Sequence, residues 1–263
     1  MTPKFKLDQH FLKDEPVLNK IIASSELKPD DIILEIGPGK GILTSALAKK
    51  ASKIIAIELD PGFKPYLDKL PANVEVHYNN ALNIIRRLRF NKIIANIPYA
   101  ISEPLLKKLF KTDFELAVLL VGKGFYSTIA GKDSKGSELD SKWAVITPIF
   151  FEINKVTDVS RDAFEPRPRT DSVLITLKKR ESKLSLAEQI IKELVLQEDK
   201  KLSNALLTGF ARVEKLTQKQ AKEKVSGLNL PEKLLDKKIA YLSNRQFMLI
   251  YNSLTCNHRI SAE

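Results

Sequence analysis

The sequence predicts an α/β protein whose parallel sheet is covered by helices on both faces, followed by a small all-helical domain. From Asp31 to Leu177 short apolar runs alternate with helix-like segments, which is the pattern of repeated β-α units. The first run leads directly into a glycine-rich turn. After Lys183 the apolar residues instead recur at helical spacing. We therefore predict two domains, residues 1–180 and residues 184–255.

Short, nearly continuous apolar runs are expected where a strand is buried on both faces of a parallel sheet. The predicted parallel strands are Ile32–Ile36, Lys53–Glu58, Val74–Tyr78, Lys92–Ala95 and Leu116–Val121. Two later runs, "PIFFEINKVTDV" and "DSVLITLKK", are joined by "SRDAFEPRPRT". We expect them to form an antiparallel pair that closes the sheet with an antiparallel edge strand.

The C-terminal part of the chain has the pattern of amphipathic helices. The stretches "LAEQIIKELVLQEDKKLSNALLTGF" and "EKLLDKKIAYLSNRQFMLIYNSL" place apolar residues at helical spacing, and "SGLNLP" separates them. This pattern predicts the helical domain over residues 184–255.

The turn after the first predicted strand, in "EIGPGKGILTSALAKK", is typical of a nucleotide-binding loop. Glycines let the main chain approach a ligand, and a helix N-terminus offers unpaired N–H groups. The glycines are Gly37, Gly39 and Gly41, and Ile42 stands where a dinucleotide-binding fingerprint has its third glycine. This spacing disfavours NAD and resembles the first motif of S-adenosylmethionine-dependent methyltransferases.

The next two strands end in residues that suit a nucleoside. Glu58 ends the second strand, where a carboxylate can accept both hydroxyls of a ribose. Asn80, in "HYNNAL", follows the third strand and would lie beside an adenine ring. Alternatively, Glu58 is a surface acid and the two asparagines form a turn. Because turn, helix, strand and acid come in the right order, we favour a site for S-adenosylmethionine.

The fourth strand ends in Asn96-Ile97-Pro98-Tyr99, which resembles the N/D-P-P-Y/F motif of enzymes that methylate a planar amine. The carbonyls of the Asn96 side chain and the Ile97 main chain could accept from that amine and direct its lone pair at the methyl group. Pro98 stiffens the turn, and Tyr99 offers a face on which an extruded base can stack. Orientation and electrostatics would supply most of the rate. The alternative is a strand-ending turn with a core tyrosine.

Four stretches together resemble the small-subunit ribosomal RNA adenine dimethyltransferases, the KsgA-type family. They are "LDQHFLKD", "NIPYAISEP", "DAFEPRPRTDSV" and "KKLSNAL", and the resemblance extends over nearly the whole chain. It implies the class I S-adenosylmethionine-dependent methyltransferase fold, with a Rossmann-like sheet. It also implies S-adenosylmethionine as donor and two adjacent adenosines in a 3′-terminal hairpin of small-subunit rRNA as acceptors, within small-subunit biogenesis.

The resemblance also implies which residues form the site. The cofactor contacts fall on His10, Leu12, Gly37, Glu58, Asn80 and Asn96, to which the glycine turn adds Gly39. The predicted catalytic residues are Asn96, Pro98, Tyr99 and Phe164. Phe164 would stack on a flipped base, among Arg161, Arg167 and Arg169, which suit the flanking phosphates. The alternative is that Phe164 only fills the edge of the sheet.

The chain departs from the family pattern at several positions. Asp8 replaces a glycine, Asn80 replaces an aspartate, and Gly122 to Gly124 replace Gln-x-Glu, while Trp143 stands in a segment that usually has small or charged residues. These departures motivate a second hypothesis, a weakly catalytic or non-catalytic assembly factor of the small subunit. A third hypothesis is an adenine methylase of large-subunit rRNA. A small-molecule methyltransferase is disfavoured because it leaves the basic loops without a role.

The composition limits the partners. The formal net charge is +11, and clusters such as "RRLR" and "RPR" suit a polyanion or, equally, a solvated surface. Cys256 is the single cysteine and the three histidines are scattered, so we expect no metal site. We find no apolar run of membrane-spanning length and no signal peptide. We therefore expect a soluble cytoplasmic protein that binds no membrane and, by default, a monomer.

Overall fold

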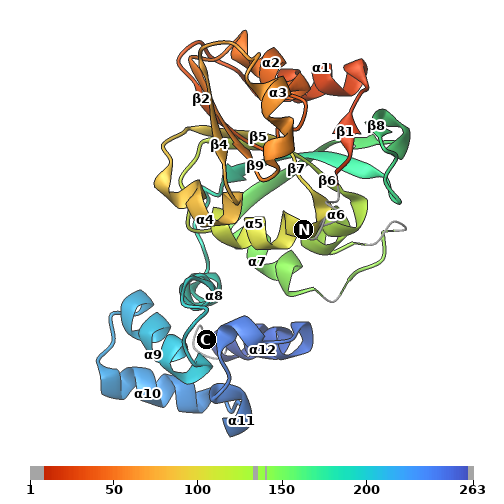
Figure 1. Ribbon diagram of the computed structural model, residues 1–263. Coiled ribbons are helices and arrows are strands. Elements are labelled where there is room, and N and C mark those ends of the chain that lie inside the picture. The colour runs from red at the N-terminus through yellow and green to blue at the C-terminus, as the bar shows by residue number, and fades with distance from the viewer. Residues whose placement is uncertain (1–8, 133–135, 140, 260–263) are drawn as a thin grey trace, which may run out of the picture. The chain divides into compact units, whose positions relative to one another are not determined.

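The computed structural model describes residues 9–132, 136–139 and 141–259, and these residues form two compact units (Figure 1). The first unit comprises Met1–Ser127 and Phe151–Lys179, and the second comprises Thr128–Phe150 and Arg180–Glu263. Residues 128–150 thus group with the second unit although they precede residue 180 in the chain. The predicted domain boundaries, 1–180 and 184–255, stay a prediction. Asp8 lies outside the described residues.

The first unit is built on a seven-stranded sheet in the order β4-β3-β2-β5-β6-β9-β7. The first five of these strands are parallel, as predicted, and their ends agree with the prediction to within one residue. The strands are β2 (Ile32–Ile36), β3 (Lys53–Glu58), β4 (Val74–Tyr78), β5 (Lys92–Asn96), β6 (Leu116–Gly122), β7 (Phe151–Val159) and β9 (Ser172–Lys179). The short, mostly apolar runs of the sequence therefore form parallel strands, as the pattern predicts.

The predicted antiparallel pair is confirmed, but the antiparallel strand lies one position in from the edge. β9 pairs antiparallel with both β6 and β7, so the edge strand β7 runs in the same direction as the first five strands. The burial of the two strands explains this order. Most of β9 is buried, whereas most of the residues of β7 between its buried ends are exposed. The more apolar strand therefore occupies the inner position.

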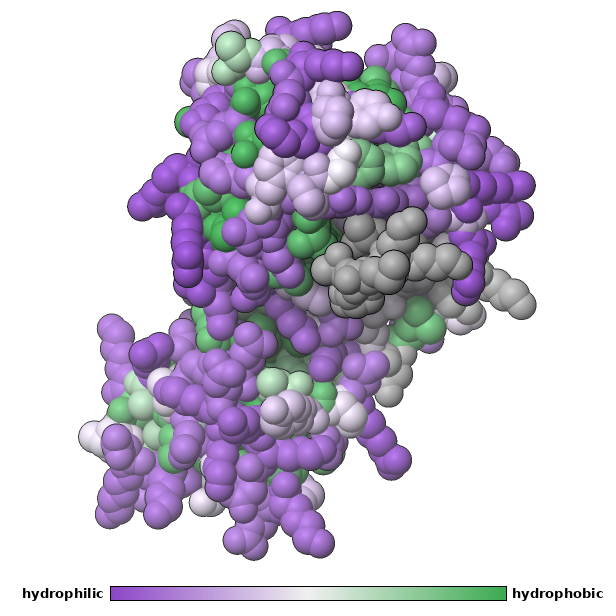
Figure 2. Space-filling view, viewed as in Figure 1, coloured by the Kyte–Doolittle hydropathy of each residue, from purple (hydrophilic) through white to green (hydrophobic). Residues whose placement is uncertain are grey.

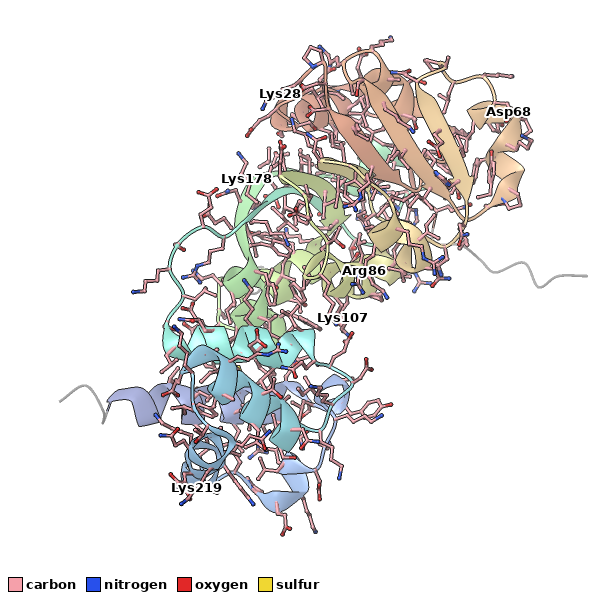
Figure 3. All side chains as sticks on the ribbon, turned by 90° about the vertical axis from the view of Figure 1, so that its left-hand side faces the viewer. Lys28, Asp68, Arg86, Lys107, Lys178 and Lys219 are labelled. Carbon is pink, nitrogen blue, oxygen red and sulfur yellow. The ribbon has the colours of Figure 1, made fainter. Side chains whose placement is uncertain are left out.

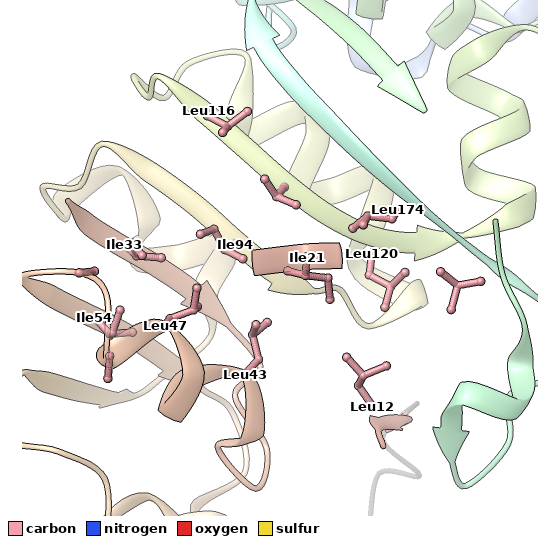
Figure 4. Close-up of a cluster of buried hydrophobic side chains, with 14 of the residues drawn as sticks. Leu12, Ile21, Ile33, Leu43, Leu47, Ile54, Ile94, Leu116, Leu120 and Leu174 are labelled. Carbon is pink, nitrogen blue, oxygen red and sulfur yellow. The ribbon is translucent and has the colours of Figure 1, made fainter. Parts of the chain in front are cut away.

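Helices cover both faces of the sheet. Ile21 and Leu47, from the helices on one face, pack against Ile33, Ile54 and Ile94, which point from three neighbouring strands (Figure 4). Because side chains alternate along a strand, the intervening buried residues face the other side, where α5 buries its own leucines. The helices are α1 (Glu15–Ser24), α2 (Ile42–Ala48), α3 (Lys64–Leu67), α4 (Ala81–Ile84), α5 (Ser102–Leu109) and α6 (Lys123–Ala130), with 3-10 turns η1 (Pro61–Phe63), η2 (Ile85–Arg87), η3 (Tyr99–Ile101) and η4 (Arg161–Ala163).

A two-stranded ribbon joins the N-terminal arm to the loop between β7 and β9. β1 (Phe11–Leu12) pairs antiparallel with β8 (Phe164–Glu165), so that Leu12 lies opposite Phe164. Beside the ribbon, the Lys13 amide donates to the Ala163 carbonyl over 2.9 Å. These bonds hold the arm next to the carboxyl ends of the central strands.

The second unit is helical, as the C-terminal pattern predicts. Its helices are α7 (Lys142–Phe150), α8 (Leu186–Leu196), α9 (Leu202–Val213), α10 (Gln218–Gly227), α11 (Glu232–Leu235), the 3-10 turn η5 (Ile239–Tyr241) and α12 (Asn244–Arg259). A capping box starts α8, where the side chains of Ser185 and Glu188 each bond the other's main-chain amide. Gly209 of α9 lets α8 approach, because a Cβ there would lie 3.4 Å from an Ile190 methyl group.

On the face that Figure 2 shows, hydrophilic side chains dominate both units and hydrophobic ones form small groups. Exposed charged side chains such as Lys28, Asp68 and Arg86 extend from the first unit (Figure 3). None of the helices among the residues that the structure describes is both long and apolar enough to cross a membrane.

Candidate active site

A cavity of about 210 Å³ opens in the first unit at the carboxyl ends of β2, β3, β4 and β5. Ligands of open α/β sheets bind at this edge. The cavity brings together nine of the predicted residues: His10, Leu12, Gly37, Gly39, Glu58, Asn80, Asn96, Pro98 and Tyr99. Phe164, Arg161, Arg167 and Arg169 do not line it.

The glycine turn between β2 and α2 forms one wall. Gly37 has a φ of +72° and Gly39 a φ of +54°, and residues other than glycine rarely adopt such values. A Cβ at Gly39 would also lie 2.8 Å from the ring of Phe11, the first residue of β1. Glycine is therefore required at this position both for the turn and for the close approach of the N-terminal arm.

Glu58, at the end of β3, is held with its carboxylate facing the turn. One oxygen accepts from the Gly39 amide over 3.0 Å and the other from the Asp60 amide over 2.9 Å. Only 5% of the residue is exposed. Each carboxylate oxygen has a second lone pair, so Glu58 can still accept from the hydroxyls of a ligand.

Glu35 is a cavity residue that the sequence reasoning did not assign to the site. It lies near the end of β2, is 2% exposed, and its Oε2 has no hydrogen-bond partner among the described residues. Burial raises the pKa of this carboxyl to about 8, and the neighbouring Glu58 carboxylate adds to the increase. The signal in the sequence is the acid within the apolar run "IILEI". Because burial of an unpaired carboxylate is costly, an acid in a buried strand indicates a functional role.

The Asn96 amide has a defined orientation. Its Nδ2 donates to the main-chain carbonyl of His10 over 2.9 Å, which leaves Oδ1 as a hydrogen-bond acceptor. The next residue is fixed as well, because the Ile97 amide donates to the Leu120 carbonyl of β6 over 3.0 Å. The side-chain carbonyl of Asn96 and the main-chain carbonyl of Ile97 therefore belong to residues that are each fixed by a hydrogen bond.

The ring of Tyr99 is positioned by two strands. Its hydroxyl lies 2.6 Å from Ser172 Oγ at the start of β9, and a Cβ added to Gly122 of β6 would lie 3.4 Å from the ring. The imidazole of His10 lies 5.8 Å away between ring centres. Gly122 is one of the departures from the family pattern, and here it leaves room for the ring. Sequence reasoning missed Ser172, although it belongs to the "DAFEPRPRTDSV" stretch.

Phe164 does not line the cavity, and its stacking role stays a prediction. The residue is 1% exposed and belongs to the hydrophobic core, in the same cluster as Leu12 and Leu174. Its position in the core beside the ribbon favours the alternative, that Phe164 fills the edge of the sheet.

The three predicted RNA-binding arginines lie exposed on the loop between β7 and β9. Arg167 pairs with Asp162 over 2.8 Å, and the Arg161 side chain donates to the Arg169 carbonyl over 3.4 Å. This loop is connected to the cavity, because His10 Nδ1 lies 2.8 Å from the Pro166 carbonyl. The arginines are thus joined to the arm that bonds Asn96.

The cavity residues fit S-adenosylmethionine. Glu58 can hold ribose hydroxyls, the unpartnered Glu35 Oε2 suits an ammonium group, and the glycine turn admits a ligand close to the main chain. Among the described residues, no three His, Cys, Asp or Glu side chains cluster as metal ligands would. The fold and this cavity define a class I S-adenosylmethionine-dependent methyltransferase.

Comparison with known proteins identifies the family. Residues 1–255 match the family model described as ribosomal RNA adenine dimethylase. The chain is 35% identical over 265 residues to a probable ribosomal RNA small subunit methyltransferase A from Methanococcus maripaludis, covering 95% of this chain and 98% of the relative. The chain therefore belongs to the ribosomal RNA adenine dimethylase family.

Two solved structures share the fold. A dimethyladenosine transferase from Plasmodium falciparum aligns with a TM-score of 0.61 and 26% identity, over 94% of this chain and 98% of that one. The 23S rRNA methyltransferase ErmE aligns with a TM-score of 0.59 over 93% of this chain and 99% of its own. At 23% identity, this second match shows the fold alone.

Proposed function

We propose that this chain transfers methyl groups to the 6-amino groups of two adjacent adenosines in a 3′-terminal hairpin of small-subunit rRNA, yielding dimethyladenosines during small-subunit biogenesis. The family and the near full-length match to a small-subunit methyltransferase support the substrate class. The oriented Asn96 amide is the observation that carries the proposal: its Nδ2 is engaged by the His10 carbonyl, so its Oδ1 is the atom left to accept from the amine to be methylated.

The 6-amino group of adenine is a weak nucleophile, because its lone pair is delocalised into the ring. Hydrogen bonds from the amine to Asn96 Oδ1 and to the Ile97 carbonyl would favour a pyramidal nitrogen, whose lone pair is no longer delocalised into the ring and points at the methyl group. S-Adenosylmethionine, when bound, supplies an electrophilic methyl group on a good leaving group. The transfer therefore requires no strong base from the protein, because the residues of the chain contribute through orientation and electrostatics.

Tyr99 would hold the target base. Its ring is fixed from one side by Gly122 and at the hydroxyl by Ser172, so a stacked base would find a rigid partner. Pro98 restricts the turn that joins this ring to Asn96. The stacking surface and the acceptor oxygens would therefore keep a constant relative position.

The basic loop would hold the RNA that flanks the base. Arg161, Arg167 and Arg169 expose cationic side chains next to the arm that bonds Asn96. Phosphate contacts of this kind position an RNA without reading its sequence. We further propose that the enzyme acts as a monomer in the cytoplasm.

Transfer of labelled methyl from S-adenosylmethionine to under-methylated small ribosomal subunits tests the proposal when the modified nucleotides are mapped. We expect label on two adjacent adenosines near the 3′ end of the small-subunit RNA. Label on large-subunit RNA would instead indicate the large-subunit methylase. Binding to the subunit without any transfer would indicate the assembly factor.

A further inference from the structure

The first unit carries a second group of arginines besides those on the loop between β7 and β9. All six arginines of this unit fall into two groups of three, and its other permanently charged basic side chains are lysines. The second group, which we call the η2 arginines, consists of Arg86, Arg87 and Arg89 in the crossover from β4 to β5. A guanidinium group can bind a phosphate through two parallel hydrogen bonds, so this selective use of arginine indicates phosphate ligands.

The charge of the η2 arginines is not compensated by neighbouring acids. Each of the three is exposed, and within the described part of the chain none has an ion pair or a side-chain hydrogen bond. Residues 76–102 contain neither Asp nor Glu. The acid of α5, the helix that packs against α4, is Glu103, which is paired with Lys107 over 3.2 Å. A polyanion could therefore bind the η2 arginines without breaking an ion pair of the protein.

The η2 arginines are anchored to the core and lie near the cavity. Ile85, the first residue of η2, is completely buried and fixes the turn. The turn continues α4, which begins at Ala81, a residue that lines the cavity. At 1.5 Å per residue of α-helix and 2.0 Å per residue of 3-10 helix, the main chain of Arg86 is about 10 Å from that of Ala81. Arg86 extends from the surface of the first unit (Figure 3).

We propose that the η2 arginines bind phosphates of the substrate RNA, as a second contact surface besides the loop between β7 and β9. This inference rests on the proposed RNA substrate and adds a place at which that RNA is held. The crossover with η2 starts from the edge strand β4, whereas the loop starts from the opposite edge strand, β7. RNA held at both surfaces would therefore extend across the carboxyl ends of the strands, where the cavity opens.

The informative variant is Arg86→Gln/Arg87→Gln, which removes two adjacent cations and keeps polar side chains. Lys49→Gln/Lys50→Gln is the matched control, because it removes two adjacent exposed cations at the end of α2, a helix that leads away from the carboxyl end of β2. A third variant, Arg86→Lys/Arg87→Lys, keeps both charges. None of the four positions lines the cavity, so an unchanged dissociation constant of S-adenosylhomocysteine verifies the fold of each variant.

The experiment measures binding of the full chain to under-methylated small ribosomal subunits over a range of salt concentrations. We expect Arg86→Gln/Arg87→Gln to reduce the slope of log K against log salt by about 1.5, as for the loss of two phosphate contacts. Its affinity at low salt should fall by about tenfold or more. The lysine control and Arg86→Lys/Arg87→Lys should each keep the slope of the wild type to within about 0.5.

An unchanged slope in Arg86→Gln/Arg87→Gln would overturn this inference and leave the proposed function intact. An equal reduction in Lys49→Gln/Lys50→Gln would overturn it as well, because only the total charge would then matter. The same holds for an equal reduction in Arg86→Lys/Arg87→Lys, which retains the charge. Failure of the wild type to bind the subunits would instead refute the RNA substrate and the inference with it.

Discussion

The hydroxyl of Tyr99 lies 2.6 Å from Oγ of Ser172, and Ser172 is completely buried at the start of β9. The ring also packs over Gly122, where a Cβ would come within 3.4 Å. Two strands near the edge of the sheet thus fix the ring that the proposed mechanism uses to stack the target base. Ser172 acts on the reaction only through Tyr99, so it is a positioning residue.

Removal of this hydrogen bond should slow methyl transfer without changing the cofactor site. We expect Ser172→Ala to lower kcat by about three- to tenfold, the effect of one hydrogen bond, and to leave the dissociation constant of S-adenosylhomocysteine unchanged. In a Tyr99→Phe background the same substitution should have no further effect, because the bond is already absent. Losses that simply add in the double variant would refute this coupling.

The predictable part of the molecule depends on local signals. The strands that carry Gly37, Glu58 and Asn96 are apolar runs, and parallel strands bring their carboxyl ends to one edge of the sheet. Short motifs at those ends therefore meet in one cavity, even though 59 positions separate Gly37 from Asn96 in the sequence. Propensity and motif spacing are sufficient to predict this arrangement.

The unpredicted part depends on contacts between distant segments. Tyr99 and Ser172 are 73 residues apart, and the side chain of Asn96 bonds a main-chain carbonyl 86 residues away. The family resemblance implies a stacking role for Phe164, but no local pattern indicates that the pairing of β1 with β8 buries its side chain in the core. No local pattern indicates which strands will pair, and hence which side of a loop faces a ligand.

Glu35 should make the free protein less stable as the pH rises. Its pKa is raised from 4.5 to about 8 in the folded state, so between these values the folded state holds a proton that the unfolded state has lost. Stability therefore falls as the pH rises through this window. Urea unfolding of Glu35→Gln, which stays neutral, should show a weaker pH dependence than the wild type between pH 5 and 8. Identical pH dependence in the two proteins would contradict the assignment.

The exposed arginines on the loop between β7 and β9 should contribute to RNA binding through phosphates. Arg169→Ala should weaken binding to the subunit and reduce the slope of log K against log salt by about one. Lys49→Ala is the control, because Lys49 is an exposed cation at the end of α2, away from this loop. A salt slope that changes equally in both variants would show that only the total charge matters.

The central claim is that Asn96 directs the amine of the target adenosine. Single-turnover methyl transfer to under-methylated small subunits by Asn96→Ala tests it most directly, with Asn83→Ala as the control on an exposed asparagine outside the cavity. We expect the rate of Asn96→Ala to fall by about a hundredfold or more, as for loss of one preorganised polar group, while its affinity for the subunit stays close to that of the wild type. Transfer by Asn96→Ala at a rate near that of the wild type would contradict the account.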